Sequence, residues 1–356
     1  MTAAPALSCI LTVTAGEGAR AAHSLRRLLA LAGALEIMVI DHGADAGTRA
    51  MLAGLSHPQL RLVRMAPAPR GAARNRGLAL AQGARLCVLT PGDTLAPFGL
   101  TALVESDADC LFLPAALRGE DGMVAPTGQP VFDWLAGAGL DRADTSHERF
   151  AQMLTRLALL PQMPALRVVR RGLVRDHALS FAHEADSGWL FATGALMNAQ
   201  SLAVAPLPSV TLWQEVGPEA TRGTGFETLS DAAQALHLFE RARHFHDPVM
   251  RAALLGAVFH PLAGLMAALP ADAQQALGHA SRLVLARLDA RLVRAASVDM
   301  RAGPEATLAP CAPWLGAALE HAQVLCEPPA SPLAPKLRQS AIARLAVWAR
   351  GSSETS

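Results

Sequence analysis

The sequence predicts a doubly wound α/β fold, in which helices cover both faces of a mostly parallel sheet, followed by an all-helical C-terminal region. Up to about Asp121, short apolar runs alternate with stretches whose apolar residues recur at helical spacing. The strand signal then fades, and later residues are rich in alanine, leucine and arginine at helical spacing. Doubly wound sheets bind ligands at the carboxyl ends of their strands, so a site is expected there.

The expected strands are short runs rich in apolar and β-branched residues. They are Leu7–Thr14, Glu36–Ile40, Leu60–Met65, Arg85–Leu89 and Cys110–Leu113. Amphipathic helices are expected between the first of these strands, over Gly18–Ala34, Ala46–Leu55 and Gly71–Gln82. This strand–helix alternation is the pattern of a parallel sheet.

Weaker patterns follow in the middle of the chain. Two further helices are expected over His147–Leu160 and Asp186–Gln200, with a short apolar run at Leu166–Val169 between them. Two prolines interrupt Leu202–Trp213, which favours extended segments on a sheet edge because proline cannot donate to a neighbouring strand. Gly217–Gly225 is polar and glycine-rich and is expected to be a loop.

The segment Thr228–Cys326 is expected to be helical, with breaks at its prolines. Within it, Ala252–Pro270 carries no formal charge and approaches the ~20 residues that cross a bilayer. Because Pro261 interrupts this stretch, we expect two buried helical turns rather than a membrane span. Glu327–Pro335 is proline-rich, which is typical of a stiff linker.

We therefore expect three parts along the chain. The first is an α/β domain over residues 1–216, the second a helical region over 217–326, and the third a linker with a tail helix over 327–356. The tail segment 335–351 combines an apolar helical face with basic residues and Trp348. Such a helix lies at a membrane surface or packs on the body of the protein, and both interpretations stay open.

Composition excludes several classes of function. The 356 residues carry 31 basic and 30 acidic side chains, a balance that argues against a dedicated nucleic-acid binder. Lys336 is the only lysine and tyrosine is absent, so Schiff-base lysine chemistry has almost no residue to use. The five cysteines show no C-x-x-C spacing, which argues against a zinc site. With no secretory signal apparent, we expect a cytoplasmic protein.

Two segments in the first half place charged groups at expected strand or helix ends. Val39–Thr48 is a strand ending at Asp41, where a carboxylate can accept hydrogen bonds from a base or ribose; helix capping by Asp45 is the alternative. Arg70–Gly83 begins a helix among three arginines, Arg70, Arg74 and Arg76. A helix N-terminus attracts anions and arginine suits phosphate, although a solvated basic face has the same pattern.

Two later segments contain carboxylates that could carry chemistry. Val88–Pro97 holds Pro91-Gly92, typical of a type II turn, followed by Asp93, a metal ligand or an ordinary turn residue. Leu179–Phe191 holds Glu184 and Asp186 before a helix, where one is a general base or both cap the helix.

Taken in order, these segments resemble family-2 glycosyltransferases of the GT-A fold, from about Leu7 to Trp213. The family segment V-D-D-G-S-x-D-G-T is mirrored by Val39–Thr48, with Asp41 at its first acidic position. The stretch A-R-N-x-G-L-x-x-A-x-G is matched by Ala73–Gly83 and is the most specific part of the likeness. The resemblance implies inverting transfer from a nucleotide-diphospho-sugar. It also implies donor contacts at Thr12, Thr14, Asp41, Arg74 and Asn75.

The sequence departs from the family at the metal motif. The family has D-x-D-D, whereas this chain has Thr90-Pro91-Gly92-Asp93 and keeps only the last carboxylate. The resemblance implies Mg²⁺ or Mn²⁺ at Asp93, with His244 or His246 as further ligands that would compensate for the lost carboxylates. Taken alone, those two histidines belong to a polar helix end or a metal site.

A second departure lies in the catalytic motif. Some members have H-E-D-x-x-W, and this chain has His183-Glu184-Ala185-Asp186-Ser187-Gly188-Trp189. Counting back from Trp189 makes Asp186 the base, whereas counting forward from His183 places Ala185 there. A one-residue insertion reconciles the two, and the resemblance then implies that Asp186 takes the acceptor proton, with Glu184 beside it.

The function predicted is glycosyl transfer to an envelope polysaccharide, a lipid-linked acceptor or a glycolipid. The alternative is a catalytically degenerate GT-A domain that binds nucleotide sugars or acts as a scaffold. Expected partners are the donor and a saccharide or lipid-linked acceptor, with no nucleic acid. Contact with the inner face of the membrane through 335–351 and self-association through the helical region are further expectations.

Overall fold

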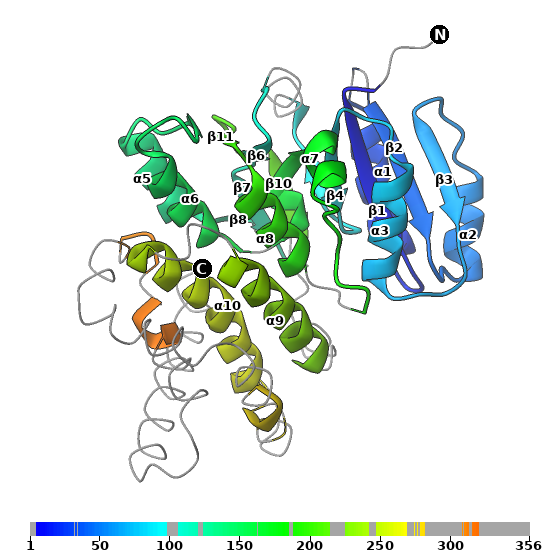
Figure 1. Ribbon diagram of the computed structural model, residues 1–356. Helices are drawn as coiled ribbons and strands as arrows, with labels where there is room; N and C mark the ends of the chain where they lie inside the picture. Colours follow the sequence, from blue (N-terminus) through cyan, green and yellow to red (C-terminus); the bar gives the residue numbers. More distant parts are fainter. Residues whose placement is uncertain are drawn as a thin grey trace.

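The computed structural model (Figure 1) describes most of the chain up to residue 268. The described residues are 5–31, 33, 35–97, 106–119, 124–161, 163–184, 188–213, 225–241 and 247–268, with pieces at 274, 276, 278–281, 308, 310–312 and 315–319.

A large sheet runs through the molecule in the order β3-β2-β1-β4-β10-β6-β11-β9 (Figure 1). Its strands are β1 (Leu7–Val13), β2 (Leu35–Asp41), β3 (Leu60–Arg64), β4 (Arg85–Leu89), β6 (Cys110–Phe112), β9 (Arg142–Asp144), β10 (Arg167–Arg170) and β11 (Ser201–Val204). Strand β10 is antiparallel to β4 and β6, and β9 is antiparallel to β11. All other strands of this sheet point the same way, which confirms the predicted mostly parallel sheet.

Helices cover both faces of this sheet because its strands are apolar on both sides. Along β1, Ile10 packs into the core that includes α3 (Arg70–Leu80), while Cys9 and Leu11 pack into the core that includes α1 (Gly18–Leu29) and α2 (Ala46–Ala53). This alternation follows from the two-residue period of a strand. The α3 face also carries α5 (Gln129–Gly137), α6 (Phe150–Ala158) and α8 (Trp189–Asn198).

A second, smaller sheet was not predicted from the sequence. It has the order β5-β12-β7-β8, with strands β5 (Thr94–Leu95), β7 (Ala115–Arg118), β8 (Val124–Thr127) and β12 (Val210–Trp213). Leu95, Val210 and Leu212 share the α1 core, and β5 contacts α1. The small sheet therefore packs on the face that α1 covers.

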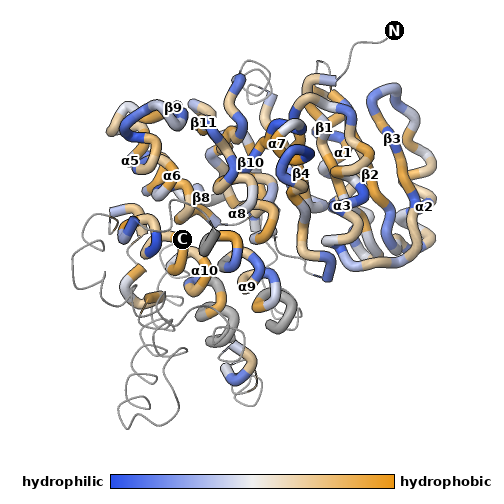
Figure 2. Tube along the Cα trace, viewed as in Figure 1, coloured by the Kyte–Doolittle hydropathy of each residue, from blue (hydrophilic) through white to orange (hydrophobic). Residues whose placement is uncertain are grey.

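The helical region continues the other core. Helix α9 (Gly225–Arg241) packs against α8, and α10 (Pro248–Ala268) packs against α6 and α9. Leu229, Leu254 and Phe259 belong to the same core cluster as Ile10 of the sheet. The hydropathy colouring in Figure 2 shows the apolar character of the sheet strands and of much of α10. Among the described helices, none has the length and hydropathy that crossing a bilayer requires.

Two predictions about prolines are wrong. Strands β11 and β12, within the stretch expected on a sheet edge, are interior strands: β11 lies between β6 and β9, and β12 between β5 and β7. The prolines fall between the two strands, where no ladder donor is needed. Helix α10 continues through Pro261, and Val258, Phe259 and Leu262 are buried around it. Their burial outweighs the backbone hydrogen bond that proline cannot donate.

The other expected helices and strands lie close to where the sequence placed them, most with shorter ends, whereas α5, α7 (Arg171–Asp176) and β9 were not predicted. Helix α1 ends at Leu29, α6 begins at Phe150 and α8 begins at Trp189. The short apolar run at Leu166–Val169 is β10, preceded by η1 (Pro164–Leu166) and followed by α7. The linker and tail of 327–356, with His244, His246 and Asp186, lie outside the described residues.

Candidate functional site

The carboxyl ends of β1, β2 and β4 meet at one edge of the large sheet. Val13 pairs with Asp41, and Leu11 pairs with Leu89, so Thr12, Asp41 and the turn after Leu89 are neighbours. The predicted site residues of these strands are thus brought together, as expected for the ligand edge of a doubly wound sheet.

Arg70, at the start of α3, connects this edge to α1. Its Nη2 lies 2.7 Å from Oε1 of Glu17, and its Nη1 donates to the backbone oxygen and hydroxyl of Thr12, both at 3.3 Å. Glu17 also accepts the backbone amide of Thr14 at 3.0 Å through Oε2. Sequence reasoning missed Glu17; its place just before α1, beside the predicted Thr12 and Thr14, is the signal that could have found it.

Asp41 is buried, and its carboxylate shapes the turn that follows β2. Oδ1 accepts the backbone amides of Gly43 and Ala44 at 3.1 and 2.8 Å, and Oδ2 accepts Nε of Arg49 at 3.1 Å. Burial alone would raise the pKa of Asp41, but the two amides and the guanidinium lower it overall. The carboxylate is therefore ionised and held in place, and its contact with a donor stays a prediction.

His42 follows at the same edge and was not singled out from the sequence. Its Nδ1 donates to the carbonyl oxygen of Ala68 at 2.7 Å, because a carbonyl can only accept. Its Nε2 is buried and has no hydrogen-bond partner within the described part of the chain. His42 occupies the second acidic position of the family segment, so the two acidic positions hold one carboxylate, Asp41, and one imidazole.

Asn75 and Arg74 contact the loop that carries the predicted catalytic residues. Nδ2 of Asn75 donates to the carbonyl oxygen of Phe181 at 2.9 Å, and the amide of Phe181 donates to Oδ1 of Asn75 at 2.8 Å. The guanidinium of Arg74 is buried over the ring of Phe181, 5.2 Å from its centre. Phe181 stacks in turn on Phe191 of α8, with ring centres 4.5 Å apart. In this structure both α3 residues hold the loop; their donor contacts stay predictions.

The same loop passes directly over the first turn of α3. The amide of Ala72 donates to the carbonyl oxygen of His183 at 3.2 Å, so part of the helix N-terminus is satisfied by protein. Gly71 permits this approach, because a Cβ there would lie 1.9 Å from the oxygen of Ala182. Glu184 is exposed, with Oε1 2.7 Å from Nδ1 of His183. Asp186 follows this loop but lies outside the described residues.

Asp93 joins the turn after β4 to the small sheet. Its side chain is buried; Oδ2 accepts the amide of Thr90 at 2.8 Å and Oδ1 accepts the amide of Trp213 at 2.9 Å. Burial raises the pKa of Asp93 to about 6, because desolvation outweighs these hydrogen bonds and the charges of Arg74 and Arg70. The turn itself forms as predicted, with a positive φ at Gly92.

The described residues around Asp93 do not fit a site for Mg²⁺ or Mn²⁺. Both carboxylate oxygens of Asp93 accept backbone amides, and the other acidic positions of the family motif are Thr90 and Gly92, which offer no carboxylate. Within the described part of the chain, no cluster of acidic, histidine or cysteine side chains could hold a metal ion. A cation at Asp93 therefore stays a prediction without support from this geometry.

The helical region contributes Asp231, which the sequence did not indicate. This residue of α9 is completely buried. Its Oδ2 accepts the amide of Trp189 at 3.1 Å and its Oδ1 accepts the amide of Leu190 at 2.9 Å. These are the first amides of α8, so α9 caps the helix that follows the predicted catalytic motif.

Comparisons with known proteins agree with this fold. No protein-family model matches the chain, and no curated protein sequence matches it. Among solved structures, S. aureus TarS 1-349 in complex with UDP-GlcNAc is similar, with a TM-score of 0.64, 15% identity and 90% of each chain covered. TarS 1-349 by itself gives a TM-score of 0.61 at 15% identity, and its complex with UDP gives 0.59 at 14% identity. The chain therefore has a GT-A-like glycosyltransferase fold.

Proposed function

We propose that the protein is a glycosyltransferase that moves a sugar, with inversion, from a nucleotide-diphospho-sugar to an acceptor hydroxyl. The observation that carries the proposal is the likeness to TarS 1-349 over 90% of both chains, because that protein was solved with UDP-GlcNAc and with UDP. The A-R-N segment, the most specific part of the sequence resemblance, lies in α3, whose first residue Arg70 contacts Thr12 of β1 at the carboxyl edge of the large sheet.

The donor diphosphate is proposed to lie near the start of α3. Arg70 and Arg74 both act on the pKa of Asp93, so two guanidinium groups lie near one carboxylate that is only partly ionised near pH 6. Guanidinium groups bind diphosphates well, and a donor here would compete with Glu17 for Arg70. Arg70 already contacts Thr12 of β1, and this contact would position its guanidinium beside the donor.

The chemistry we propose is a single in-line displacement at the anomeric carbon. Asp186 takes the proton of the acceptor hydroxyl as its oxygen attacks, and the bond from that carbon to the diphosphate breaks. Arginine charge stabilises the leaving nucleotide diphosphate. Glu184, in the same loop, is the second candidate base, and its Oε1 lies 2.7 Å from Nδ1 of His183.

The acceptor is proposed to be a saccharide or a lipid-linked hydroxyl compound of envelope polysaccharide biosynthesis. The basic tail 335–351 would bring the enzyme to a membrane surface that carries such an acceptor. Liposome co-sedimentation of the full chain and of a chain lacking residues 335–356 tests this contact, and equal binding by both forms contradicts it.

Donor binding and catalysis are tested separately. Calorimetric titration with UDP and other nucleoside diphosphates, with Mn²⁺ or with EDTA, tests the binding site. We expect affinity in EDTA within about threefold of that with Mn²⁺, because no described cluster holds a cation. Loss of nucleotide binding in EDTA would show that binding requires a divalent cation. No binding in either buffer would contradict a nucleotide site.

Catalysis is tested by sugar-nucleotide hydrolysis or transfer over a donor panel. Asp186→Asn is expected to lower turnover about 10²–10⁴-fold with little change in donor affinity, because it removes the proposed base. Asp176→Asn, at the exposed end of α7, is the matched control and should retain activity. Unchanged turnover in Asp186→Asn would overturn the assignment of the base.

The second candidate function is a GT-A domain that binds nucleotide sugars without transferring them. The contacts of Asp93 favour it, because the one remaining acidic residue of the metal motif is used to hold the small sheet. Nucleotide-sugar binding without turnover over the whole panel would support this second function and contradict the enzyme.

A further inference from the structure

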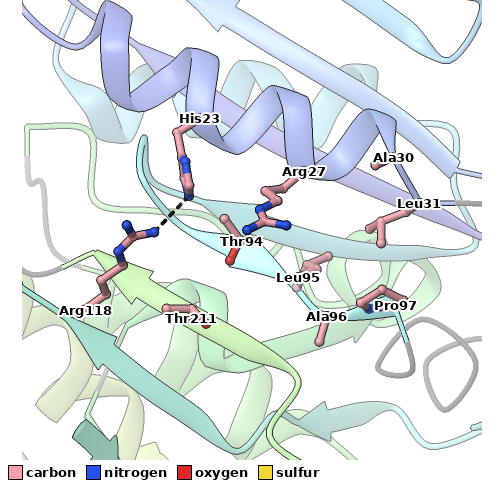
Figure 3. Close-up of a pocket in the computed structure, with 10 residues that line it drawn as sticks. All are labelled: His23, Arg27, Ala30, Leu31, Thr94, Leu95, Ala96, Pro97, Arg118 and Thr211. Atoms are coloured by element: carbon pink, nitrogen blue, oxygen red, sulfur yellow. Dashed lines mark hydrogen bonds between the residues drawn. The ribbon is translucent and has the colours of Figure 1, made fainter. Parts of the chain in front are cut away.

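A basic cavity lies between α1 and the small sheet, apart from the residues of the candidate donor site. It has a volume of about 390 Å³, within the usual range for small-ligand pockets. His23 and Arg27 line it from α1, Arg118 from β7, and Thr94 and Thr211 from β5 and β12. Figure 3 shows these side chains around one open space, with His23 and Arg118 directed toward each other.

The charge of this cavity has one sign. None of its lining residues is acidic, whereas two arginines and one histidine are present. Nη1 of Arg118 lies 3.4 Å from Nε2 of His23, so the guanidinium donates to a neutral imidazole whose proton is on Nδ1. Burial lowers the pKa of His23, and the charges of Arg118, Arg27 and Arg26 lower it further. The two positive charges of Arg27 and Arg118 repel each other, and an anion bound between them would offset this repulsion.

The donors fit phosphate better than carboxylate. Two guanidinium groups and the hydroxyls of Thr94 and Thr211 offer more donors than the two oxygens of a carboxylate can accept. A phosphate group carries three terminal oxygens and up to two charges, which matches this set. The rest of the lining is apolar, with Leu31, Leu95 and Pro97, so it can hold an organic portion of the ligand.

We infer that the cavity formed by His23, Arg27, Arg118, Thr94 and Thr211 binds the phosphate group of a phosphorylated small molecule, at a site separate from the donor diphosphate. This site does not depend on glycosyl transfer. It lies, however, next to the contact by which Asp93 joins the turn after β4 to the small sheet. Thr94 follows Asp93 in the chain, and Thr211 pairs with Thr94 in that sheet.

The test is titration of the full chain with inorganic phosphate and with a hexose phosphate, at constant ionic strength, followed by calorimetry and by NMR of the histidine ring protons. We expect saturable binding and a rise in the pKa of His23, because the bound anion offsets the charges of Arg118 and Arg27. The ring-proton signal that is missing in the spectrum of His23→Gln is assigned to His23. Absence of saturable binding, or binding that leaves the His23 titration unchanged, overturns the inference.

Two variants separate a specific site from general attraction. Arg118→Gln should weaken phosphate binding about tenfold or more, because it removes a charged donor from the cavity. Arg26→Gln removes a charge from the exposed face of the same helix without lining the cavity, and should change affinity less than about twofold. Equal losses in both variants would show charge attraction alone and contradict a built site.

A UDP titration separates this cavity from the donor site. If the two are distinct, Arg118→Gln leaves UDP affinity unchanged while it weakens phosphate binding. An equal loss for UDP and phosphate would mean that the cavity takes the nucleotide's own diphosphate, and the inference of a separate site would fail. Phosphate binding in a protein that binds no UDP would leave this inference standing and contradict only the proposed function.

Discussion

The side-chain amide of Asn75 is hydrogen-bonded to both backbone groups of Phe181, a residue 106 positions further along the chain. One bond runs from Nδ2 to the carbonyl oxygen and the other from the backbone amide to Oδ1, at 2.9 and 2.8 Å. A primary amide supplies its donor and its acceptor on separate atoms side by side, whereas an ionised carboxylate only accepts. Asparagine in the A-R-N segment therefore fixes the loop that precedes the predicted catalytic residues.

Asn75→Ala should lower the free energy of unfolding by about 2 kcal/mol, because it removes both partners of a part-buried backbone. Urea denaturation measures the change. Arg76→Ala, at the next and exposed position of α3, is the control and should stay within about 0.5 kcal/mol of the parent. A variant that keeps its stability but loses UDP binding would instead show that Asn75 contacts the donor, as the resemblance implies.

Much of the fold could be predicted because its central strands carry local signals. Strands β1, β2 and β4 are mostly apolar and buried along their whole length, which is typical of a parallel sheet buried on both faces. The small sheet gave no such signal: β5 has 2 residues, and its partners come from distant parts of the chain. Such strands exist because neighbours pair with them, and a single sequence does not display that pairing.

The candidate site could be predicted as a set of positions, but not as a set of contacts. Asp41, Arg74 and Asn75 lie near the predicted edge, yet Asp41 accepts the amides of its own turn, and the two α3 residues contact the backbone or the ring of Phe181. Their partners are set by tertiary packing. Asp231 is the clearest case, because a buried carboxylate within an expected helix has no local pattern that reveals its role.

Because Asp231 of α9 accepts the first two amides of α8, we predict that the helical region stabilises the start of α8. Asp231→Ala should lower the free energy of unfolding by about 2–4 kcal/mol, because it leaves two helix-start amides without an acceptor. Ser230→Ala, the exposed neighbour on α9, is the matched control. Hydrogen exchange at the amides of Trp189 and Leu190 should become faster in the Asp231 variant alone. Unchanged exchange at both amides would contradict the capping role.

From the hydrogen bonds of Asp45 we predict how the free energy of unfolding changes at low pH. Its carboxylate accepts the amide of Gly16 and the amide and hydroxyl of Thr48, and these bonds lower its pKa to about 2. Because the native state favours the ionised form, the contribution of Asp45 is complete above the unfolded pKa near 4. It is lost as the pH falls from about 4 to about 2.

Asp45→Asn should therefore show a flatter fall in stability over that pH range than the parent protein. Asparagine still caps α2, so the difference reports the charge rather than the loss of the cap. Chemical denaturation at several pH values measures it, with Asp133→Asn on the exposed face of α5 as control. Parallel curves for the parent and Asp45→Asn would disprove the role of these hydrogen bonds.

Gly71 gives a prediction whose sign opposes helix propensity. In a helix, Gly→Ala usually stabilises by up to about 1 kcal/mol. At Gly71, however, a Cβ would lie 1.9 Å from the oxygen of Ala182 and 2.8 Å from that of His183. These are backbone atoms, so the loop must move away from α3. Gly71→Ala should therefore destabilise the protein, and it should lower turnover by displacing the segment that leads to Asp186.

The control for this prediction is Gly137→Ala, at the last residue of α5, where a new Cβ meets no atom within 4 Å. That variant should be neutral or slightly stabilising, because only helix propensity changes. Thermal unfolding of the two variants then gives shifts of opposite sign or, at least, a loss confined to Gly71→Ala. A stabilised Gly71→Ala protein would mean that the loop of Ala182 and His183 does not rest on the first turn of α3, and would contradict the contact between the two.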